Sequence, residues 1–373
     1  MNGIGLDMKR NQIIQIYGTD YRRMTKELLA KADLLSHLPG KEALIGIKPN
    51  LVCPSPANFG ATTHPEIVAG LIEFLQEAGY QNLLITEGSW VGDKTADAYE
   101  YCGYRELCEK YHVPFFDNQK DHWHEIDAAG MRLKVCDVVD RVDFLINMPV
   151  VKGHCQTRVT CALKNLKGLL PNMEKRHFHQ MGLHKPIAHL ASAVRPDFIL
   201  VDHICGDPDF EEGGNPLVRN CIFAALDPVL VDAYTCKELG VDVSDVPYIG
   251  MAERLGVGST DLAAADIIRL NSTSEAKVTP PLSEKRVLEV SYAADECDSC
   301  SACYASLIPA LYRLKEEGLM EKLPCKIAIG QGHRGKTGLL GVGACTSGFD
   351  FNIPGCPPDE DAIYEGLKAF VTR

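Results

Sequence analysis

The sequence predicts an α/β protein: an open, mostly parallel sheet with helices on both faces, joined to a small C-terminal α+β cysteine-rich domain. Two observations lead to this prediction. Short apolar segments alternate with helical patterns up to residue 272, which is typical of parallel strands connected by crossover helices. Beyond a segment rich in Ser, Thr, Lys and Pro, the cysteines become closely spaced, which indicates a separate small domain.

Residues 1–272 form the expected α/β body. Its strands are expected at the apolar runs 13–17, 43–48, 82–86, 142–147, 198–202 and 220–225. Its helices are expected at 20–36, 63–77, 157–169, 184–194, 229–239 and 246–255. Thr63 is the expected N-cap of the helix that ends at residue 77, and Asp227 is expected to cap the helix at 229–239.

Residues 273–286, which include Pro280-Pro281, form the expected linker. Residues 287–373 then form the small domain. We expect a strand at 287–291, a helix at 305–317, strands at 326–330 and 339–342, and a last helix from residue 359.

Composition excludes several classes of protein. The chain carries a formal charge of -12 and has no run of Lys and Arg, which argues against nucleic-acid binding. No apolar run is long enough to span a membrane. The 15 cysteines are odd in number and scattered, which favours reduced thiols and a cytoplasmic location. The sequence leaves open whether the chain forms a homo-oligomer.

The C-terminal cysteines are the main chemical signal. Thiolates at short spacing, with two more from a distant loop, suit an iron–sulfur cluster or a four-thiolate zinc site. The expected ligands are Cys300, Cys303, Cys345 and Cys356, with Cys297 as the alternate. A helix is expected to begin just after the first pair, and its unpaired N–H groups would stabilise thiolates. The uneven spacing and the prolines after Cys356 favour a [4Fe–4S] cluster over zinc, and Cys325 is expected to be a core residue.

Several short motifs along the chain resemble those of one family. They are Ile47-Lys48-Pro49-Asn50, Thr63-His64-Pro65, Lys152-Gly153-His154 and the run from Leu163 to Gly168, together with the Cys-x2-Cys and Gly-Cys-Pro-Pro elements. This set resembles the domain-of-unknown-function 362 family, whose members are often described as iron–sulfur cluster-binding. The resemblance implies a cluster and an α/β body, and it implies no particular reaction. Many members carry a ferredoxin-type run of four Cys, which this chain lacks.

The body contains a candidate site for an anionic ligand. Ligands of open parallel sheets bind beyond the carboxyl ends of the strands. Lys and Asn side chains concentrated at those ends suit a phosphate or carboxylate group. The expected catalytic residues are His154 and Lys152, and the expected substrate-binding residues are Lys48, Asn50, Lys164, Asn165 and Asp202. No nucleotide-binding motif is present.

Two further groups carry weaker signals. His177, His179 and His184 could bind a metal, serve as acid–base groups, or be ordinary surface residues. Residues 207–212 contain four acidic side chains, for which a solvated loop is expected rather than a cation site.

The sequence therefore indicates a [4Fe–4S] protein that acts as a redox enzyme or electron-transfer protein on a small anionic molecule. An oxidoreductase is one interpretation, and the enzymatic character stays open. The alternatives are a non-catalytic electron carrier that serves a redox partner protein, and a zinc-stapled α/β enzyme.

Overall fold

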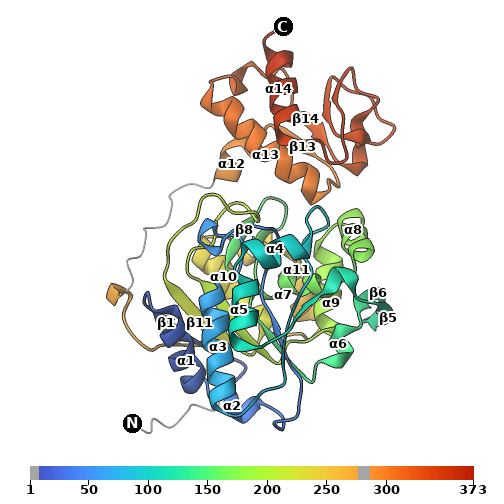
Figure 1. The fold of residues 1–373 in the computed structure, drawn as a ribbon. Coiled ribbons are helices and arrows are strands. Elements are labelled where there is room, and N and C mark those ends of the chain that lie inside the picture. The colour runs from blue at the N-terminus through green and yellow to red at the C-terminus, as the bar shows by residue number, and fades with distance from the viewer. Residues whose placement is uncertain (1–7, 276–285) are drawn as a thin grey trace. The chain divides into compact units, whose positions relative to one another are not determined.

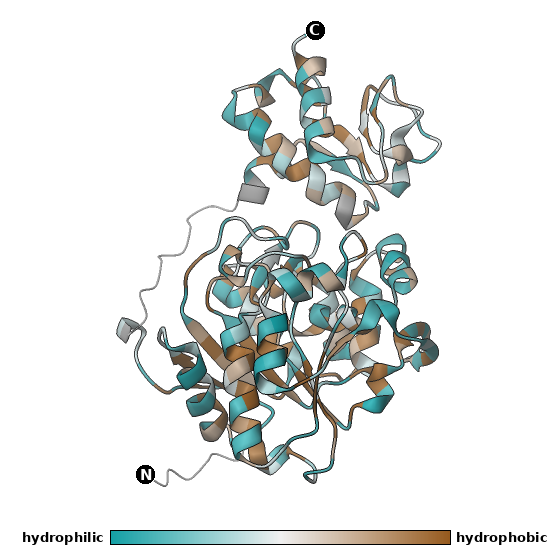
Figure 2. Ribbon diagram, viewed as in Figure 1, coloured by the Kyte–Doolittle hydropathy of each residue, from teal (hydrophilic) through white to brown (hydrophobic). Residues whose placement is uncertain are grey.

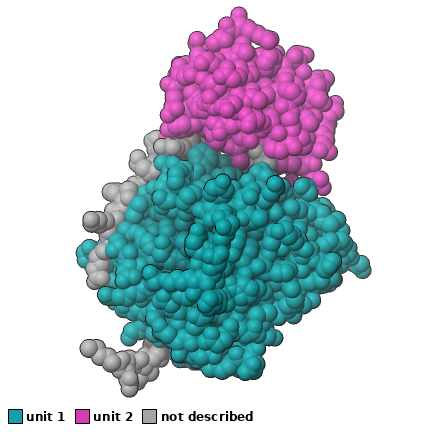
Figure 3. Space-filling view, in the orientation of Figure 1, with its two compact units in different colours: residues 1–178, 183–280 teal, residues 179–182, 281–373 magenta. Residues whose placement is uncertain are grey.

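The computed structural model describes residues 8–275 and 286–373, which fall into two compact units (Figure 1, Figure 3). Unit 1 comprises residues 1–178 and 183–280, and unit 2 comprises residues 179–182 and 281–373. Residues 276–285, the larger part of the predicted linker at 273–286, lie outside the described residues.

An eight-stranded sheet forms the centre of unit 1, in the order β12-β1-β11-β10-β7-β2-β3-β4. The five strands from β10 to β4 are mutually parallel, whereas β11 runs antiparallel to β1 and β10. The prediction of an open, mostly parallel sheet is therefore confirmed. The bounds are β1 (Gln12–Tyr17), β2 (Ile45–Lys48), β3 (Leu83–Glu87), β4 (Phe115–Asp117), β7 (Phe144–Asn147), β10 (Phe198–His203), β11 (Cys221–Ala225) and β12 (Asp266–Arg269).

Helices cover both faces of this sheet, so the central strands are buried on both sides and their sequences are continuous apolar runs (Figure 2). One apolar cluster contains residues of α1 (Tyr21–Lys31), α3 (Pro65–Glu77) and α5 (Tyr104–Tyr111). The other contains residues of α9 (His184–Ala193) and α11 (Pro247–Arg254). Helix α10 (Pro228–Leu239) contributes to both clusters.

Shorter elements complete unit 1. Two hairpins, β5 (Trp123–Ala128) with β6 (Met131–Cys136) and β8 (Lys152–His154) with β9 (Arg158–Thr160), lie outside the main sheet. The remaining helices are α2 (Leu34–His37), α4 (Thr95–Tyr101), α6 (Val138–Arg141), α7 (Ala162–Asn165) and α8 (Asn172–Met181). The 3₁₀ turn η3 (Leu166–Leu169) directly continues α7.

Unit 2 contains a four-stranded sheet that is parallel throughout, in the order β13-β14-β15-β16. The strands are β13 (Ala294–Glu296), β14 (Ile327–Ile329), β15 (Leu340–Val342) and β16 (Phe351–Ile353). Helix α12 (Arg286–Ser291) precedes β13, α13 (Ser301–Glu316) follows it, and α14 (Glu360–Val371) ends the unit. Apolar side chains of α13 and α14, including Leu307, Leu311, Ile363 and Leu367, are fully buried.

Several local predictions are confirmed, and three are wrong. Asp227 caps α10 by accepting the N–H groups of its first turn, as expected. Thr63 does not cap α3, because its hydroxyl donates to the carbonyl of Met148 and accepts the N–H of Asn50. Residues 157–169 form β9, α7 and η3 rather than one helix, and residues 287–291 belong to α12 rather than to a strand.

No helix in the described ranges, 8–275 and 286–373, is long and apolar enough to cross a membrane.

Candidate functional site

The most polar part of the interior of unit 1 lies where the crossover direction of the sheet reverses. Strands β2 and β7 are parallel neighbours, but the chain continues from β2 to β3 on one side and from β7 to β10 on the other. Open α/β sheets bind ligands beyond the carboxyl ends of strands at such a reversal. Lys48 and Asn147 end these two strands, and Glu87 ends β3. All three are buried, which is costly unless their polar atoms are satisfied.

Lys48 and Glu87 form a fully buried ion pair. Their side chains are 0% and 3% exposed, and Lys48 Nζ lies 2.6 Å from Glu87 Oε2. Glu87 also accepts the N–H groups of Leu51, at 3.2 Å, and Gly88, at 2.7 Å. Burial lowers the pKa of Lys48, and the charge of Glu87 opposes that shift. The Lys48 ammonium group is therefore already paired with a carboxylate of the protein itself.

Lys152 organises a chain of buried amides. Its ammonium group donates to the carbonyls of Ala61 and Glu211, at 2.5 and 2.8 Å, and to Asn50 Oδ1 at 3.3 Å. Asn50 donates to Asn165 at 2.9 Å, and Asn165 donates to Asn147 at 2.7 Å. The predicted residues Asn50, Lys152 and Asn165 thus lie in one hydrogen-bonded network that fixes the loop after β2 to β7 and α7. These three acceptors can satisfy all three N–H donors of the Lys152 ammonium group.

Glu211 connects His154 with Lys164. Its Oε1 forms an ion pair with Lys164 Nζ, and its Oε2 lies 3.1 Å from His154 Nε2. Nδ1 of His154 accepts the N–H groups of Gln156 and Thr157, so we assign the ring proton to Nε2, which donates to Glu211. Burial, together with the Lys164 charge, lowers the pKa of His154 to about 4, so the ring is neutral at pH 7. Burial opposes ionisation of Glu211, but Lys164 and His154 hold its pKa well below the usual value.

Most of the acidic side chains in the loop that carries Glu211 are buried, so the expectation of a solvated acidic loop is wrong. Asp207 and Asp209 are buried, and Glu211 is mostly buried, whereas Glu212 is exposed. The carboxylate of Asp207 accepts the N–H groups of Asp209, Phe210 and Asn215 at 2.8 to 2.9 Å. Asp207 therefore shapes the turn that directs Glu211 toward His154.

Two further lysines belong to the same region. Lys175 on α8 donates to the carbonyls of Gly88 and Ser89, both at 2.8 Å, and burial lowers its pKa to about 8. Lys167 on η3 is partly buried, and burial and the neighbouring Lys164 lower its pKa to about 7. The sequence placed Lys167 near a helix end without assigning it a role, and nothing in the sequence pattern singled out Lys175.

Asp202, which was expected to bind substrate, lies in a buried Cys–His–Asp arrangement. His64 Nδ1 lies 2.8 Å from Asp202 Oδ2, and His64 Nε2 lies 3.6 Å from Cys205 Sγ. Burial opposes the charge, yet Asp202 raises the pKa of His64 to about 10, so the pair is ionised at pH 7. Asp202 also accepts the main-chain N–H of His64, which fixes the start of α3 against the end of β10.

The three histidines of the second candidate group have separate environments. His177 lies 3.5 Å from Glu174 on α8, and His184 stacks on Tyr248 at 5.9 Å. His179 belongs to the segment assigned to unit 2. Within residues 8–275 and 286–373, no group of three or more Cys, His, Asp or Glu side chains is arranged to hold a metal ion.

The four cysteines predicted as ligands in unit 2 come from three separate segments. Cys300 is the N-cap residue of α13, Cys303 lies in its first turn, Cys345 lies in the turn η8 (Ala344–Thr346), and Cys356 follows β16. Burial raises the pKa of Cys300, and Cys345 and Cys356 raise it further. Burial, followed by the charges of Cys300, Cys356 and Cys345, raises the pKa of Cys303 to about 12. The four thiols are therefore close enough to repel one another as thiolates.

Local backbone structure supports this approach of the segments. Gly343 has φ +93°, and a Cβ atom at this position would lie 3.9 Å from Cys303 Sγ. The N–H of Ala344 donates to the carbonyl of Gly355 at 2.8 Å, which ties the Cys345 turn to the Cys356 loop. Arg334 Nε donates to Cys345 Sγ at 3.4 Å.

Two other cysteines of unit 2 have different surroundings. Cys297 packs against Gly332 and is not among the thiols that raise the pKa values of Cys300 and Cys303. Cys325, which was expected to be a core residue, precedes β14 and is partly exposed.

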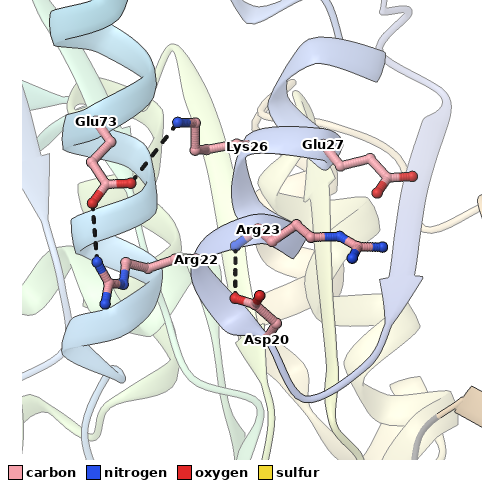
Figure 4. A pocket seen from close by; sticks show the side chains of 6 residues that line it. All are labelled: Asp20, Arg22, Arg23, Lys26, Glu27 and Glu73. Atoms are coloured by element: carbon pink, nitrogen blue, oxygen red, sulfur yellow. Dashed lines mark hydrogen bonds and ion pairs between the residues drawn. The ribbon is translucent and has the colours of Figure 1, made fainter.

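A charged depression between α1 and α3 is a different kind of surface (Figure 4). Glu73 lies 3.2 Å from Arg22 and 3.9 Å from Lys26, so the charges along it neutralise one another. Arg22 is half-exposed, so these ion pairs are weak and solvated.

Comparisons with known proteins locate unit 1 within a family. Residues 45–237 match the family described as "Domain of unknown function (DUF362)". A thylakoid-associated protein, sll1697, of Synechocystis sp. is 26% identical over 264 residues, which cover 68% of this chain and 75% of that protein. The lactate racemase apoprotein of Thermoanaerobacterium thermosaccharolyticum is 15% identical with a TM-score of 0.44, over 65% of this chain and 60% of that chain. The family match runs from β2 to α10 and covers more than half of the sequence, so the chain belongs to the DUF362 family.

Proposed function

We propose that this protein is an iron–sulfur protein whose α/β unit acts on a small anionic molecule. Cys300, Cys303, Cys345 and Cys356 would hold one [4Fe–4S] cluster, and the polar region at the ends of β2 and β7 would bind the substrate. The observation that carries the first part is that Cys345 and Cys356 raise the pKa of Cys300, and that Cys300, Cys345 and Cys356 raise the pKa of Cys303. Thiolates that repel one another in an apolar setting favour a cationic centre between them.

The donor set fits a cluster better than a single zinc ion. Zinc is held by ligands about 2.3 Å away when these are sulfurs, so its four sulfurs must nearly touch. Zinc ribbons tend to use two short Cys pairs, whereas Cys345 and Cys356 are widely spaced. Four iron atoms and four sulfides occupy more space than one zinc ion, which suits ligands from separate segments.

Neighbouring groups suit an anionic cluster. Cys300 begins the 16-residue helix α13, whose first N–H groups lack intrahelical partners and carry partial positive charge. Gln331 Nε2 donates to Cys300 Sγ at 3.8 Å, and Arg334 donates to Cys345 Sγ at 3.4 Å. Hydrogen bonds to the ligating sulfurs are a principal means of setting a cluster potential.

The cluster would supply one-electron chemistry, and unit 1 would bind and orient the substrate. An electron carrier has no need for a buried ionic region at a switch point of its sheet. The network of Lys48, Glu87, Lys152, Glu211 and Lys164 therefore favours an oxidoreductase over a non-catalytic carrier. Buried charges of this kind recur at functional sites.

Anaerobic purification followed by iron and acid-labile sulfide analysis tests the cluster. We expect about four irons per chain and a visible absorption band that bleaches with dithionite. Cys356→Ser should lose the cluster, whereas Cys325→Ser, in the same unit, should retain it. A colourless protein with one zinc, or a Cys356→Ser variant with full iron and sulfide, would overturn the assignment.

A further inference from the structure

We propose that Lys167 is a nucleophilic amine that forms an imine with the carbonyl group of a small anionic aldehyde or ketone. This proposal rests on the anionic substrate proposed for unit 1 and is independent of the cluster. Among the lysines of this region, Lys167 alone has no hydrogen-bond acceptor for its amine within the described residues.

The lysines of this region differ in how their ammonium groups are satisfied. Lys48 and Lys164 pair with carboxylates, and Lys152 and Lys175 donate to main-chain carbonyls. Lys167 has neither a hydrogen bond nor an ion pair from its side chain to any residue within 8–275 and 286–373. Its side chain is partly buried, so it retains access to solvent.

The neighbours of Lys167 disfavour its charged form. Lys164 and Lys167 are three residues apart on the continuous segment formed by α7 and η3, and such residues share one face. Glu211 holds the Lys164 ammonium group in place through an ion pair. Burial and this fixed charge bring the pKa of Lys167 to about 7, so about half of the amine is uncharged at neutral pH. Desolvation beside a second cation is an established way to activate a lysine amine.

The surroundings also suit an anionic carbonyl compound. The ammonium of Lys164 has three N–H donors, of which Glu211 accepts one, so donors remain for a carboxylate or phosphate group. His154 and Glu211 lie close enough to Lys167 for their charges to interact with it.

The reaction balances without an external oxidant or reductant. The amine nitrogen of Lys167 attacks the carbonyl carbon, and the carbonyl oxygen becomes the hydroxyl of a carbinolamine. Loss of that hydroxyl with a nitrogen-bound proton releases one water and leaves the C=N bond. The departing hydroxyl takes its proton from solvent, which reaches the partly buried Lys167.

Reductive trapping tests the proposal on the full-length protein. Glyoxylate, a small anionic aldehyde, is incubated with the protein at pH 7 and the imine is reduced with borohydride, and labelled lysines are located by peptide mass spectrometry. We expect Lys167 to be labelled at least about tenfold faster than the exposed Lys185, because its amine is far less protonated. Lys175 serves as a second internal control, because it is buried but already donates to two carbonyls.

Variants and a neutral probe separate the parts of the argument. Lys167→Arg should abolish the fast label while tryptophan fluorescence stays native. Lys164→Met should move the midpoint of the rate–pH profile upward, since it removes the cation beside the amine. The other groups that act on the Lys167 charge are Glu211, Lys175 and His154. Equal labelling rates for glyoxylate and the neutral acetaldehyde would contradict the anionic substrate. They would not contradict the proposal that Lys167 is a nucleophilic amine.

Labelling of Lys167 no faster than Lys185 would overturn the proposal. Iron analysis of the same sample reports separately on the cluster. Four irons per chain without fast labelling of Lys167 would support the cluster and contradict the imine. Fast labelling without iron would support the imine and contradict the cluster.

Discussion

The buried Lys48–Glu87 pair permits a quantitative test of how unit 1 is stabilised. We expect Glu87→Gln to lower the free energy of unfolding by about 3–5 kcal/mol, because it leaves the buried Lys48 ammonium group without an opposite charge. Lys48→Met should cost less, because Glu87 keeps two main-chain N–H donors. The double variant should be less destabilised than the sum of the two single variants, by at least about 1 kcal/mol.

Urea unfolding followed by tryptophan fluorescence measures these changes. The chain has two tryptophans, Trp90 and Trp123, and both belong to unit 1, so the signal reports on that unit. At typical urea dependences of about 1–3 kcal/mol per molar, the loss for Glu87→Gln shifts the midpoint by roughly 1–5 M. The matched control is Glu77→Gln, which breaks the Lys26–Glu77 pair on the surface, where the two side chains are 32% and 63% exposed.

The control should cost about 0.2–1 kcal/mol, because exposed pairs are already solvated. A loss for Glu87→Gln within that same range would refute the reasoning. It would mean that water reaches the pair, or that Lys48 gives up its proton without cost to the fold.

Two further predictions concern the same unit. The stability difference between the native protein and His64→Gln should be largest near pH 5–6.5, because Asp202 is ionised and the raised His64 pKa keeps the imidazolium charged. It should shrink as pH rises toward 10, where the folded His64 loses its proton, and urea titrations across pH would detect this. Gly168→Ala should cost about 1–3 kcal/mol, because the new Cβ would lie 1.7 Å from Glu87 Oε1 and must displace it. Gly40→Ala, with no atom within 4 Å of the new Cβ, should stay within about 0.5 kcal/mol, and a similar loss for both would contradict the packing argument.

The order of elements in unit 1 could be predicted because its strands are buried on both faces. Strands such as β2 and β10 are short apolar runs bounded by polar residues, and helices such as α10 carry clear capping signals. Lys48 and Asn50 could be proposed as site residues because polar side chains after a buried strand lie at one edge of the sheet.

Features that depend on tertiary contacts could not be predicted. The segment at 287–291 contains apolar and β-branched residues suited to a strand, but it folds as α12. The inward direction of Glu211 depends on Asp207 accepting three N–H groups of its own loop, which no local pattern reveals. Whether the Lys167 amine finds an acceptor among the described residues depends on which acceptors the other lysines use. This is a property of the folded hydrogen-bond network.

The position of β1 in the sheet has a consequence for synthesis of the chain. This N-terminal strand lies between β11 and β12, and its hydrogen-bonding partner Asp266 lies 254 residues further along. At about 5–20 residues per second, a ribosome needs roughly 10–50 s to make the intervening chain. Until β11 has been made, the apolar residues Ile13, Ile14 and Ile16 lack the neighbouring strand with which they pair. The sheet of unit 1 can therefore be completed only after β12 (Asp266–Arg269) has been made.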